Sequence, residues 1–212
     1  MSNEILKVIK HNFISNDSFI SSEQMDGEEV LRVIKDPIVD EEDEPTFAKI
    51  VDHDFHNGTI EVDVYSELLI NAPEYARGFI GVTFRVDERN ETFEGIYLRP
   101  TNGSSSVQLR RNRTTQYFSY PDFKYDRLRV EAPGEYESYV DIDIKEWIHM
   151  KIKVVDDKAQ LFINNESKPC LIINDLKHGK DKIGSIALWT DIGTKAYFKN
   201  LKISNDDYYN SI

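Results

Sequence analysis

The sequence has few of the residues that hold a domain together through a covalent bond or a metal. Its one cysteine, Cys170, excludes an internal disulfide, and its five histidines are scattered along 212 residues. A structural zinc site is therefore not expected. A domain of this length buries about 70% of its unfolded surface without such ties. We expect Cys170, which opens an apolar run ending at Ile173, to be an inert packing residue.

Long apolar runs and an excess of basic residues are also missing. No segment approaches the ~20 apolar residues of a membrane span, and the first residues lack the basic start and apolar stretch of an export signal. Thirty-eight acidic residues against 26 basic ones give a net charge of −12, which repels nucleic acid and anionic lipid. We expect a soluble protein with no nucleic-acid or membrane partner, cytoplasmic if the chain is full-length and periplasmic or secreted if a leader was removed. The oligomeric state is left open.

Helical periodicity is absent, and strand patterns take its place. Thr59–Tyr65 alternates apolar and polar residues, which is typical of a half-buried strand. Asp156 and Asp157 separate two such segments and predict a tight hairpin. Strands are expected over 59–65, 78–86, 93–99, 147–155, 159–163, 185–190 and 196–203, with weaker ones near 5–10, 30–35 and 46–51. This pattern predicts an all-β fold, a two-sheet antiparallel jelly-roll sandwich, in one domain over residues 1–212.

Two regions interrupt the strand pattern. The acidic run Asp40–Glu44, closed by Pro45, is predicted to be a solvated loop. Residues 101–146 are predicted to be mostly loops with short extended pieces, and they carry many arginines and tyrosines. Loops of this length in a compact domain tend to be functional.

Several segments resemble the keto-disaccharide hydrolase family of the concanavalin A-like lectin/glucanase superfamily. They are Phe55–Asp63, Ala76–Arg85, Phe93–Pro100, Arg110–Tyr117, Pro133–Glu137, Glu146–Trp147, Gly184–Trp189 and Ala196–Ile203. The resemblance spans roughly residues 45–203. It implies a concanavalin A-like sandwich and a glycoside hydrolase-like enzyme acting on a di- or oligosaccharide or a keto-sugar. It also allows elimination, in which a base removes a proton next to the keto group.

Carboxylates on the first strong strand suggest glycosidase chemistry, which needs two carboxyl groups at the scissile bond. Alternation places Glu61, Asp63, Tyr65 and Glu67 on one sheet face. The pattern is similar to the E-x-D-x-E signature of jelly-roll β-glucanases, although Tyr65 replaces the second glutamate. Glu61 and Glu67 would stand about 20 Å apart, beyond the ~5–10 Å of a catalytic pair. The pairs left open are Glu61 with Asp63, and Asp63 with Glu67 across a bend.

The predicted catalytic residues are therefore Glu94, Asp63 and Glu61. The alternative interpretation of Glu61 and Asp63 is an exposed sheet face with solvated carboxylates. For Glu94, which precedes Gly95 on an expected central strand, the alternative is a buried partner of Arg99 or Arg85.

A group of basic and aromatic residues predicts a surface for a polar ligand. Arginine offers a rigid fork of donors, and tyrosine offers a flat apolar face with a polar tip. The predicted substrate-binding residues are Tyr97, Arg99, Arg110, Arg111, Asn112, Gln116, Tyr117, Arg127 and Trp189. The alternative is an ion-pair network in which Glu131, Glu135 and Glu137 neutralise the arginines. Trp189 could equally pack in the core, where Trp147 is also expected.

No metal ligands are assigned and no cofactor is expected with certainty. Calcium, held by Asp191 or by the Asp40–Glu44 loop, is left open. A saccharide is the expected partner. Two alternatives to an enzyme stand beside it: a non-catalytic lectin-like carbohydrate-binding module and a protein–protein interaction domain. The fold alone does not choose between them, because jelly rolls serve all three uses.

Overall fold

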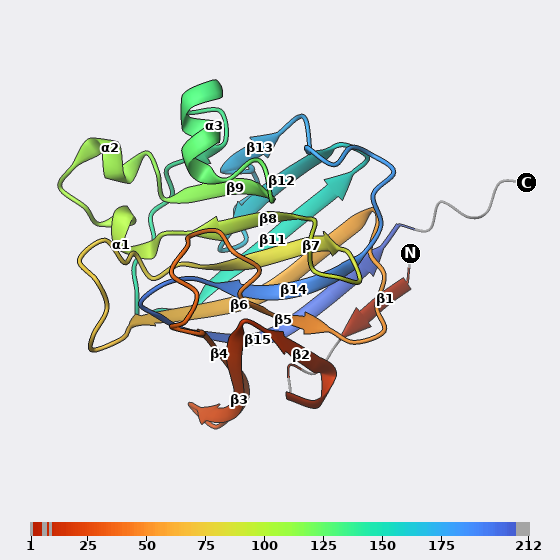
Figure 1. Ribbon diagram of the computed structural model, residues 1–212, viewed down its shortest axis with the longest axis horizontal. Helices are drawn as coiled ribbons and strands as arrows, with labels where there is room; N and C mark the ends of the chain where they lie inside the picture. The colour runs from red at the N-terminus through yellow and green to blue at the C-terminus, as the bar shows by residue number, and fades with distance from the viewer. Residues whose placement is uncertain (1, 6–7, 9, 207–212) are drawn as a thin grey trace, which may run out of the picture.

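The computed structural model describes residues 2–5, 8 and 10–206, which form two antiparallel sheets packed face to face (Figure 1). The eight-stranded sheet has the order β13-β12-β11-β6-β15-β4-β3, and β1 also pairs with β15. Its strands are β1 (Ser2–Ile5), β3 (Ser18–Met25), β4 (Glu28–Lys35), β6 (Gly58–Leu68), β11 (Ile148–Val155), β12 (Lys158–Ile163), β13 (Leu171–Ile173) and β15 (Thr194–Asn205).

The seven-stranded sheet has the order β10-β9-β8-β7-β14-β5-β2. Its strands are β2 (Phe13–Asn16), β5 (Phe47–Ile50), β7 (Ile80–Val86), β8 (Phe93–Leu98), β9 (Thr115–Tyr120), β10 (Glu137–Ser138) and β14 (Ser185–Thr190). The fold class is therefore the predicted one. The expected hairpin also forms, since β11 and β12 pair directly across Asp156 and Asp157.

The described helices are short and gather beside β8 and β9 (Figure 1). They are α1 (Pro100–Gly103), α2 (Gln108–Arg111) and α3 (Tyr125–Glu131), with a 3-10 turn, η1, at Lys10–Asn12. None of the described helices is long and apolar enough to cross a membrane. The region 101–146, expected to be mostly loops, thus holds three helices and the strands β9 and β10.

The sequence missed β2 and β3, whose alternation is weak and whose Phe19 is exposed. The strand expected near 5–10 falls partly on residues 6, 7 and 9, outside the described part of the chain; on either side of them the structure has β1 and η1.

The main core lies between the two sheets. Along β6, Ile60, Val62 and Val64 are buried, while Glu61 and Asp63 on the alternate positions point outward. Apolar residues from β4, β11 and β15 join them from the same sheet, and residues from β7, β8 and β14 meet them from the other sheet. The period of two in the sequence therefore places the core as expected.

A second apolar layer covers the outer face of the seven-stranded sheet. It is formed by aromatic residues on alternate positions to the core residues, among them Phe47, Phe93, Tyr97, Phe118 and Trp189. The Trp189 ring centroid lies 4.7 Å from that of Tyr97 and 5.2 Å from that of Phe118. Every residue of β7 and β8 is consequently buried.

Of the two tryptophans, one is buried and the other lies outside the core. Trp189 is fully buried within the outer layer, which is the packing role considered for it. The core packing expected of Trp147 is wrong. Its half-buried ring packs on Tyr65 on the outer face of the eight-stranded sheet, with the Lys199 ammonium 4.3 Å from its centroid.

The aromatic layer depends on glycine at position 81, directly opposite Tyr97. A Cβ there would lie 2.3 Å from the Ile96 carbonyl oxygen and 2.6 Å from the Tyr97 Cα. We expect Gly81→Ala to lower the free energy of unfolding by at least about 2 kcal/mol, because the clash is with backbone. Denaturant unfolding would measure it. Gly134→Ala, which meets no atom within 4 Å and strains only a left-handed backbone, is the control at about 1 kcal/mol. Equal losses for the two variants would show that close strand approach is not the constraint.

Candidate functional site

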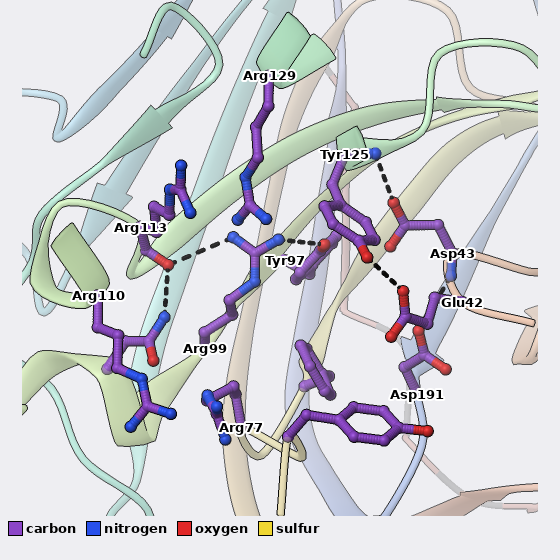
Figure 2. Close-up of a pocket in the computed structure, with 13 residues that line it drawn as sticks. Glu42, Asp43, Arg77, Tyr97, Arg99, Arg110, Arg113, Tyr125, Arg129 and Asp191 are labelled. Atoms are coloured by element: carbon purple, nitrogen blue, oxygen red, sulfur yellow. Dashed lines mark hydrogen bonds between the residues drawn. The ribbon is translucent and has the colours of Figure 1, made fainter. Parts of the chain in front are cut away.

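A pocket of about 230 Å³ opens on the outer face of the seven-stranded sheet. Phe79 and Tyr97 contribute aromatic surface to it. One wall is the loop 40–45 that precedes β5, another is the loop 73–79 that precedes β7, and a third is the segment from Arg99 through α3 (Figure 2). Its lining of aromatic and charged side chains suits a small polar ligand.

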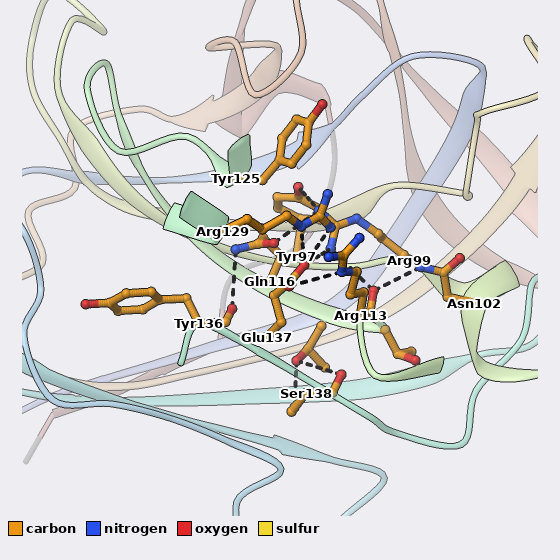
Figure 3. A network of polar contacts seen from close by, with 12 residues as sticks. Tyr97, Arg99, Asn102, Arg113, Gln116, Tyr125, Arg129, Tyr136, Glu137 and Ser138 are labelled. Atoms are coloured by element: carbon orange, nitrogen blue, oxygen red, sulfur yellow. Dashed lines mark hydrogen bonds and ion pairs between the residues drawn. The ribbon is translucent and has the colours of Figure 1, made fainter. Parts of the chain in front are cut away.

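Arg99, at the end of β8, is held on all sides. One terminal nitrogen donates to the Tyr97 hydroxyl at 2.7 Å and to the Gln116 Oε1 at 3.2 Å. The other donates to the Arg113 carbonyl oxygen at 3.3 Å and to Glu137 Oε1 at 3.4 Å (Figure 3). With only 4% of its surface exposed, Arg99 is a fixed positive charge rather than a mobile one.

Glu137 on β10 forms salt bridges with three of the arginines. Its side chain is 6% exposed and lies 2.5 Å from Arg129 and 3.4 Å from both Arg99 and Arg113 (Figure 3). The ion-pair network considered as an alternative from the sequence is thus present around this carboxylate. It neutralises part of the positive charge beside the pocket.

The opposite wall of the pocket is acidic. Asp43 is 1% exposed; its Oδ2 accepts from the Tyr125 backbone N–H at 2.9 Å, and its own N–H donates to Asp191 Oδ2 at 3.0 Å. Asp191 Oδ1 in turn pairs with Lys35 Nζ at 2.6 Å, with both side chains almost fully buried. The prediction of a solvated loop over Asp40–Glu44 is therefore wrong at Asp43, because the loop folds onto the sheet.

Further contacts hold this loop in place. The Trp189 indole N–H donates to the Glu44 carbonyl oxygen at 2.8 Å, and the Tyr120 hydroxyl donates to its carboxylate at 3.1 Å. At the end of the loop, Thr46 Oγ1 donates to the Thr190 carbonyl oxygen at 2.6 Å. The loop is thereby fixed to both β9 and β14.

The surroundings of Asp43 alter its proton affinity. Burial, and next the negative charge of Asp191, raise the pKa of Asp43 from 3.8 to about 7, against the opposing effects of Tyr125, Arg99 and Tyr97. Burial also raises the pKa of Asp191 and, well above its usual value, that of Tyr97. A carboxyl group with a pKa near neutrality in a pocket can take up or release a proton at working pH.

Glu94 lies on the other side of the sheet, in the sandwich interior. It is fully buried, and its carboxylate accepts from the His178 backbone N–H at 2.8 Å and from the Tyr117 hydroxyl at 2.6 Å. The same hydroxyl accepts from the Lys177 N–H at 2.9 Å. Glu94 and Tyr117 therefore tie the segment before β14 to β8 and β9, and neither residue lines the pocket.

Glu61 and Asp63 lie on the outer face of the eight-stranded sheet. His149 on β11 bridges them, with Nδ1 2.7 Å from Asp63 and Nε2 3.3 Å from Glu61. Asn200 donates a further hydrogen bond to Asp63 at 2.7 Å. The shared face predicted for these carboxylates is confirmed, and it is a different face from the one that bears the pocket.

The predicted ligand-binding residues are likewise only partly brought together. Tyr97, Arg99 and Arg110 line the pocket, and Gln116 lies behind Arg99. The others lie elsewhere: Arg111 packs on Tyr139, Asn112 binds Gln108, Arg127 pairs with Glu131, and Tyr117 and Trp189 are buried. The sequence suggests no role for Arg77, and it places Asp43 only in the acidic loop. It links Asp191 only to calcium, and it puts Arg129 in the basic and aromatic group without marking it as a ligand-binding residue. The acidic loop and the dense arginines were visible signals, but neither indicated which members would meet.

No group of three or more histidine, cysteine, aspartate or glutamate residues in the described part of the chain could hold a metal ion. Lys35 occupies the side of Asp191 that a cation would need. We therefore assign no calcium site to Asp191 or to the loop.

The fold has relatives among solved structures. A protein described as a "putative glycosyl hydrolase" from Parabacteroides distasonis matches 97% of this chain and 100% of its own, with a TM-score of 0.57 and 17% identity. A protein of unknown function with a galectin-like fold from Bacillus subtilis matches 89% of this chain and 87% of its own, with a TM-score of 0.53 and 12% identity. The carbohydrate-binding module CBM66 from Bacillus subtilis matches 90% of this chain and 97% of its own, with a TM-score of 0.52 and 13% identity. These likenesses place the chain in the class of galectin-like, jelly-roll β-sandwiches.

The family follows from the sequence. Residues 16–204 match the 3-keto-alpha-glucoside-1,2-lyase-like domain family, and the chain belongs to this family. This confirms the resemblance seen over 45–203 and extends it toward the N-terminus. The protein is thus a carbohydrate-active domain of the glycosyl hydrolase or carbohydrate-binding type. A search among curated proteins finds no match.

The buried position of Glu94 predicts a stability effect. Glu94→Ala leaves the His178 N–H and the Tyr117 O–H without their acceptor in the interior, so we expect a loss of about 2–4 kcal/mol in the free energy of unfolding. Glu67→Ala, which removes a partly exposed pair with Lys195 and a long hydrogen bond from Tyr65, should cost less than about 1 kcal/mol. Chemical denaturation of both variants measures the difference. Similar small losses would show that Glu94 does not anchor the segment.

The raised pKa of Asp43 predicts a pH dependence of stability. The folded protein keeps this proton up to about pH 7, whereas the unfolded chain releases it near 3.8, so the folded state binds more protons between these values. The group's contribution to stability is therefore fully present at acid pH and falls as the pH rises toward 7. Asp43→Asn keeps an acceptor for Tyr125 and suits the left-handed backbone (φ 56°).

Unfolding free energies at about pH 5 and about pH 8 test this prediction. The wild type should lose more stability than Asp43→Asn between the two conditions. Parallel losses in the two proteins would contradict the raised pKa.

Proposed function

We propose that the chain is a saccharide-cleaving enzyme that acts on keto-glycosides by elimination in the outer-face pocket, with Asp43 as the base. The observation that carries the proposal is the buried Asp43 carboxyl group in the pocket wall, whose pKa is raised to about 7. A carboxylate with this pKa is a stronger base than a solvated one and is still largely ionised just above neutral pH. The family, described as 3-keto-alpha-glucoside-1,2-lyase-like, supports the reaction type.

The reaction begins at the carbon next to the ketone. Asp43 removes the proton from carbon 2, and the electrons of that C–H bond form an enolate with the carbonyl at carbon 3. The carbonyl then re-forms, a double bond forms between carbons 1 and 2, and the bond from carbon 1 to the glycosidic oxygen breaks. The departing oxygen takes up the proton that Asp43 removed, so that no water is consumed.

The charges around Asp43 suit this reaction. Negative charge develops on the ketone oxygen in the enolate, and fixed positive groups at the pocket stabilise it without having to reorganise. Arg99 is such a group, since four hydrogen bonds hold its guanidinium in place. The positive charge of Arg99 and, to a smaller extent, the Tyr97 hydroxyl also restrain the rise of the Asp43 pKa.

A second candidate is non-catalytic saccharide binding in the same pocket. It is favoured by the number of carboxylate contacts already made, since Asp43 accepts from Tyr125 and Asp191 pairs with Lys35. Phe79 and the exposed Tyr75 would then provide the apolar surface for a sugar ring. The catalytic roles of Glu94, Asp63 and Glu61 remain predictions, and the experiment below also tests those of Asp63 and Glu61.

Turnover of 3-keto-α-glucosides, beside the unoxidised glucosides, tests the proposal. Mass spectrometry should find a keto-sugar product one water lighter than the hydrolysis product. We expect kcat/KM to rise with pH through about 7, because the base acts only when deprotonated. Asp43→Asn should lower kcat by about 100-fold or more with little change in KM.

Glu61→Gln, on the outer face of the other sheet, is the matched carboxylate control and should retain full activity. Loss of activity in Glu61→Gln or Asp63→Asn with retention in Asp43→Asn would overturn the assignment. Binding of the keto-glucoside without any product in the wild type would instead establish the second candidate.

A further inference from the structure

The pocket is divided between a basic end and an acidic end. Figure 2 shows Arg77 and Arg110 on the side of the pocket away from Asp43 and Asp191. The whole chain carries a net charge of −12, so an unneutralised positive site is unexpected. The question is whether the positive charge at this end is matched by the protein itself.

Two of the arginines at the pocket, Arg99 and Arg129, are neutralised because they share the buried Glu137 carboxylate. By contrast, neither Arg77 nor Arg110 forms a salt bridge with any residue that the structure describes. Within the described part of the chain, the Arg77 side chain donates to two backbone carbonyl oxygens, of Glu74 at 2.7 Å and Ala76 at 2.8 Å, which fix its direction without cancelling its charge.

The two guanidinium groups also affect each other. Burial, and next the positive charge of Arg110, lower the pKa of Arg77, with a smaller contribution from Arg99 and an opposing one from Glu74. Two like charges that line the same end of a pocket repel each other. An anion placed between them would relieve this repulsion, and the planar fork of arginine fits carboxylate, phosphate and sulfate groups.

We propose that the preferred ligand of this pocket is an anionic saccharide, whose carboxylate, phosphate or sulfate group binds between Arg77 and Arg110. The proposal rests on the proposed function, since it places the sugar in the same pocket with its reacting carbons toward Asp43. It adds the charge of the substrate, which the family does not specify. Arg110 on α2 is exposed, so it can be exchanged without disturbing the core.

Calorimetric titration with four matched probes tests the proposal. They are methyl α-glucoside and its uronate, 6-phosphate and 6-sulfate derivatives, at low salt and about pH 8, where all three anions are charged. At least one anionic probe should bind about 10-fold more tightly than the neutral one, as expected of a charge-assisted hydrogen bond. The preference should weaken at high salt. Which anion binds best identifies the substituent.

Arg110→Gln should remove the preference and leave the affinity for the neutral probe unchanged. Arg127→Gln is the control, because Arg127 pairs with Glu131 on the exposed side of α3 and does not line the pocket. Equal affinities for all four probes, or an equal effect of Arg110→Gln on all of them, would overturn the proposal. If the keto-glucoside is still cleaved in that case, the proposed function stands; if neutral and anionic keto-glucosides are all inert, both proposals fail.

Discussion

An apolar layer on the outer face of the seven-stranded sheet must be kept from water, and the rest of the site follows from this constraint. Antiparallel sandwiches commonly leave such a face to solvent. Here Phe47, Phe118 and Trp189 are fully buried on it, beneath the loop 40–45 and the segment that follows β8. Both covering segments are polar, so each charge that they bury needs a partner. The pocket lies where they meet.

The partners of the buried charges determine the chemistry of the pocket. Lys35 forms a salt bridge with Asp191, and the other oxygen of Asp191 accepts a hydrogen bond from the Asp43 N–H. Asp43 is left beside a carboxylate rather than an ammonium group, so its pKa rises instead of falling. A buried ion pair is weak grounds for stability, but this one joins β4, β14 and the loop at one point. The position of Asp43 depends on all three.

The sequence predicts the sheets well because alternation is a local property. The inward and outward positions of β6 followed from residues 59–65 alone, and the family segments were readable over most of the domain. Alternation does not say which outer face will be covered, however. Glu61 and Asp63 were assigned to one face correctly, yet the pocket formed on the other sheet. Trp147 was expected in the core for the same reason and lies on the uncovered face.

The site itself depends on contacts between distant parts of the chain. Asp43 and Asp191 are separated by 148 positions, and no local pattern pairs them. The run Asp40–Glu44 has the composition of a solvated loop, and only docking onto an aromatic sheet face buries one member of it. The same docking places the carboxylates and the arginines at opposite ends of the pocket. With Arg99 engaged by Tyr97 and Glu137, the acidic and basic ends do not cancel each other. Burial against the aromatic surface raises the Asp43 pKa at the acidic end, while Arg77 at the other end keeps backbone carbonyl partners that do not neutralise it.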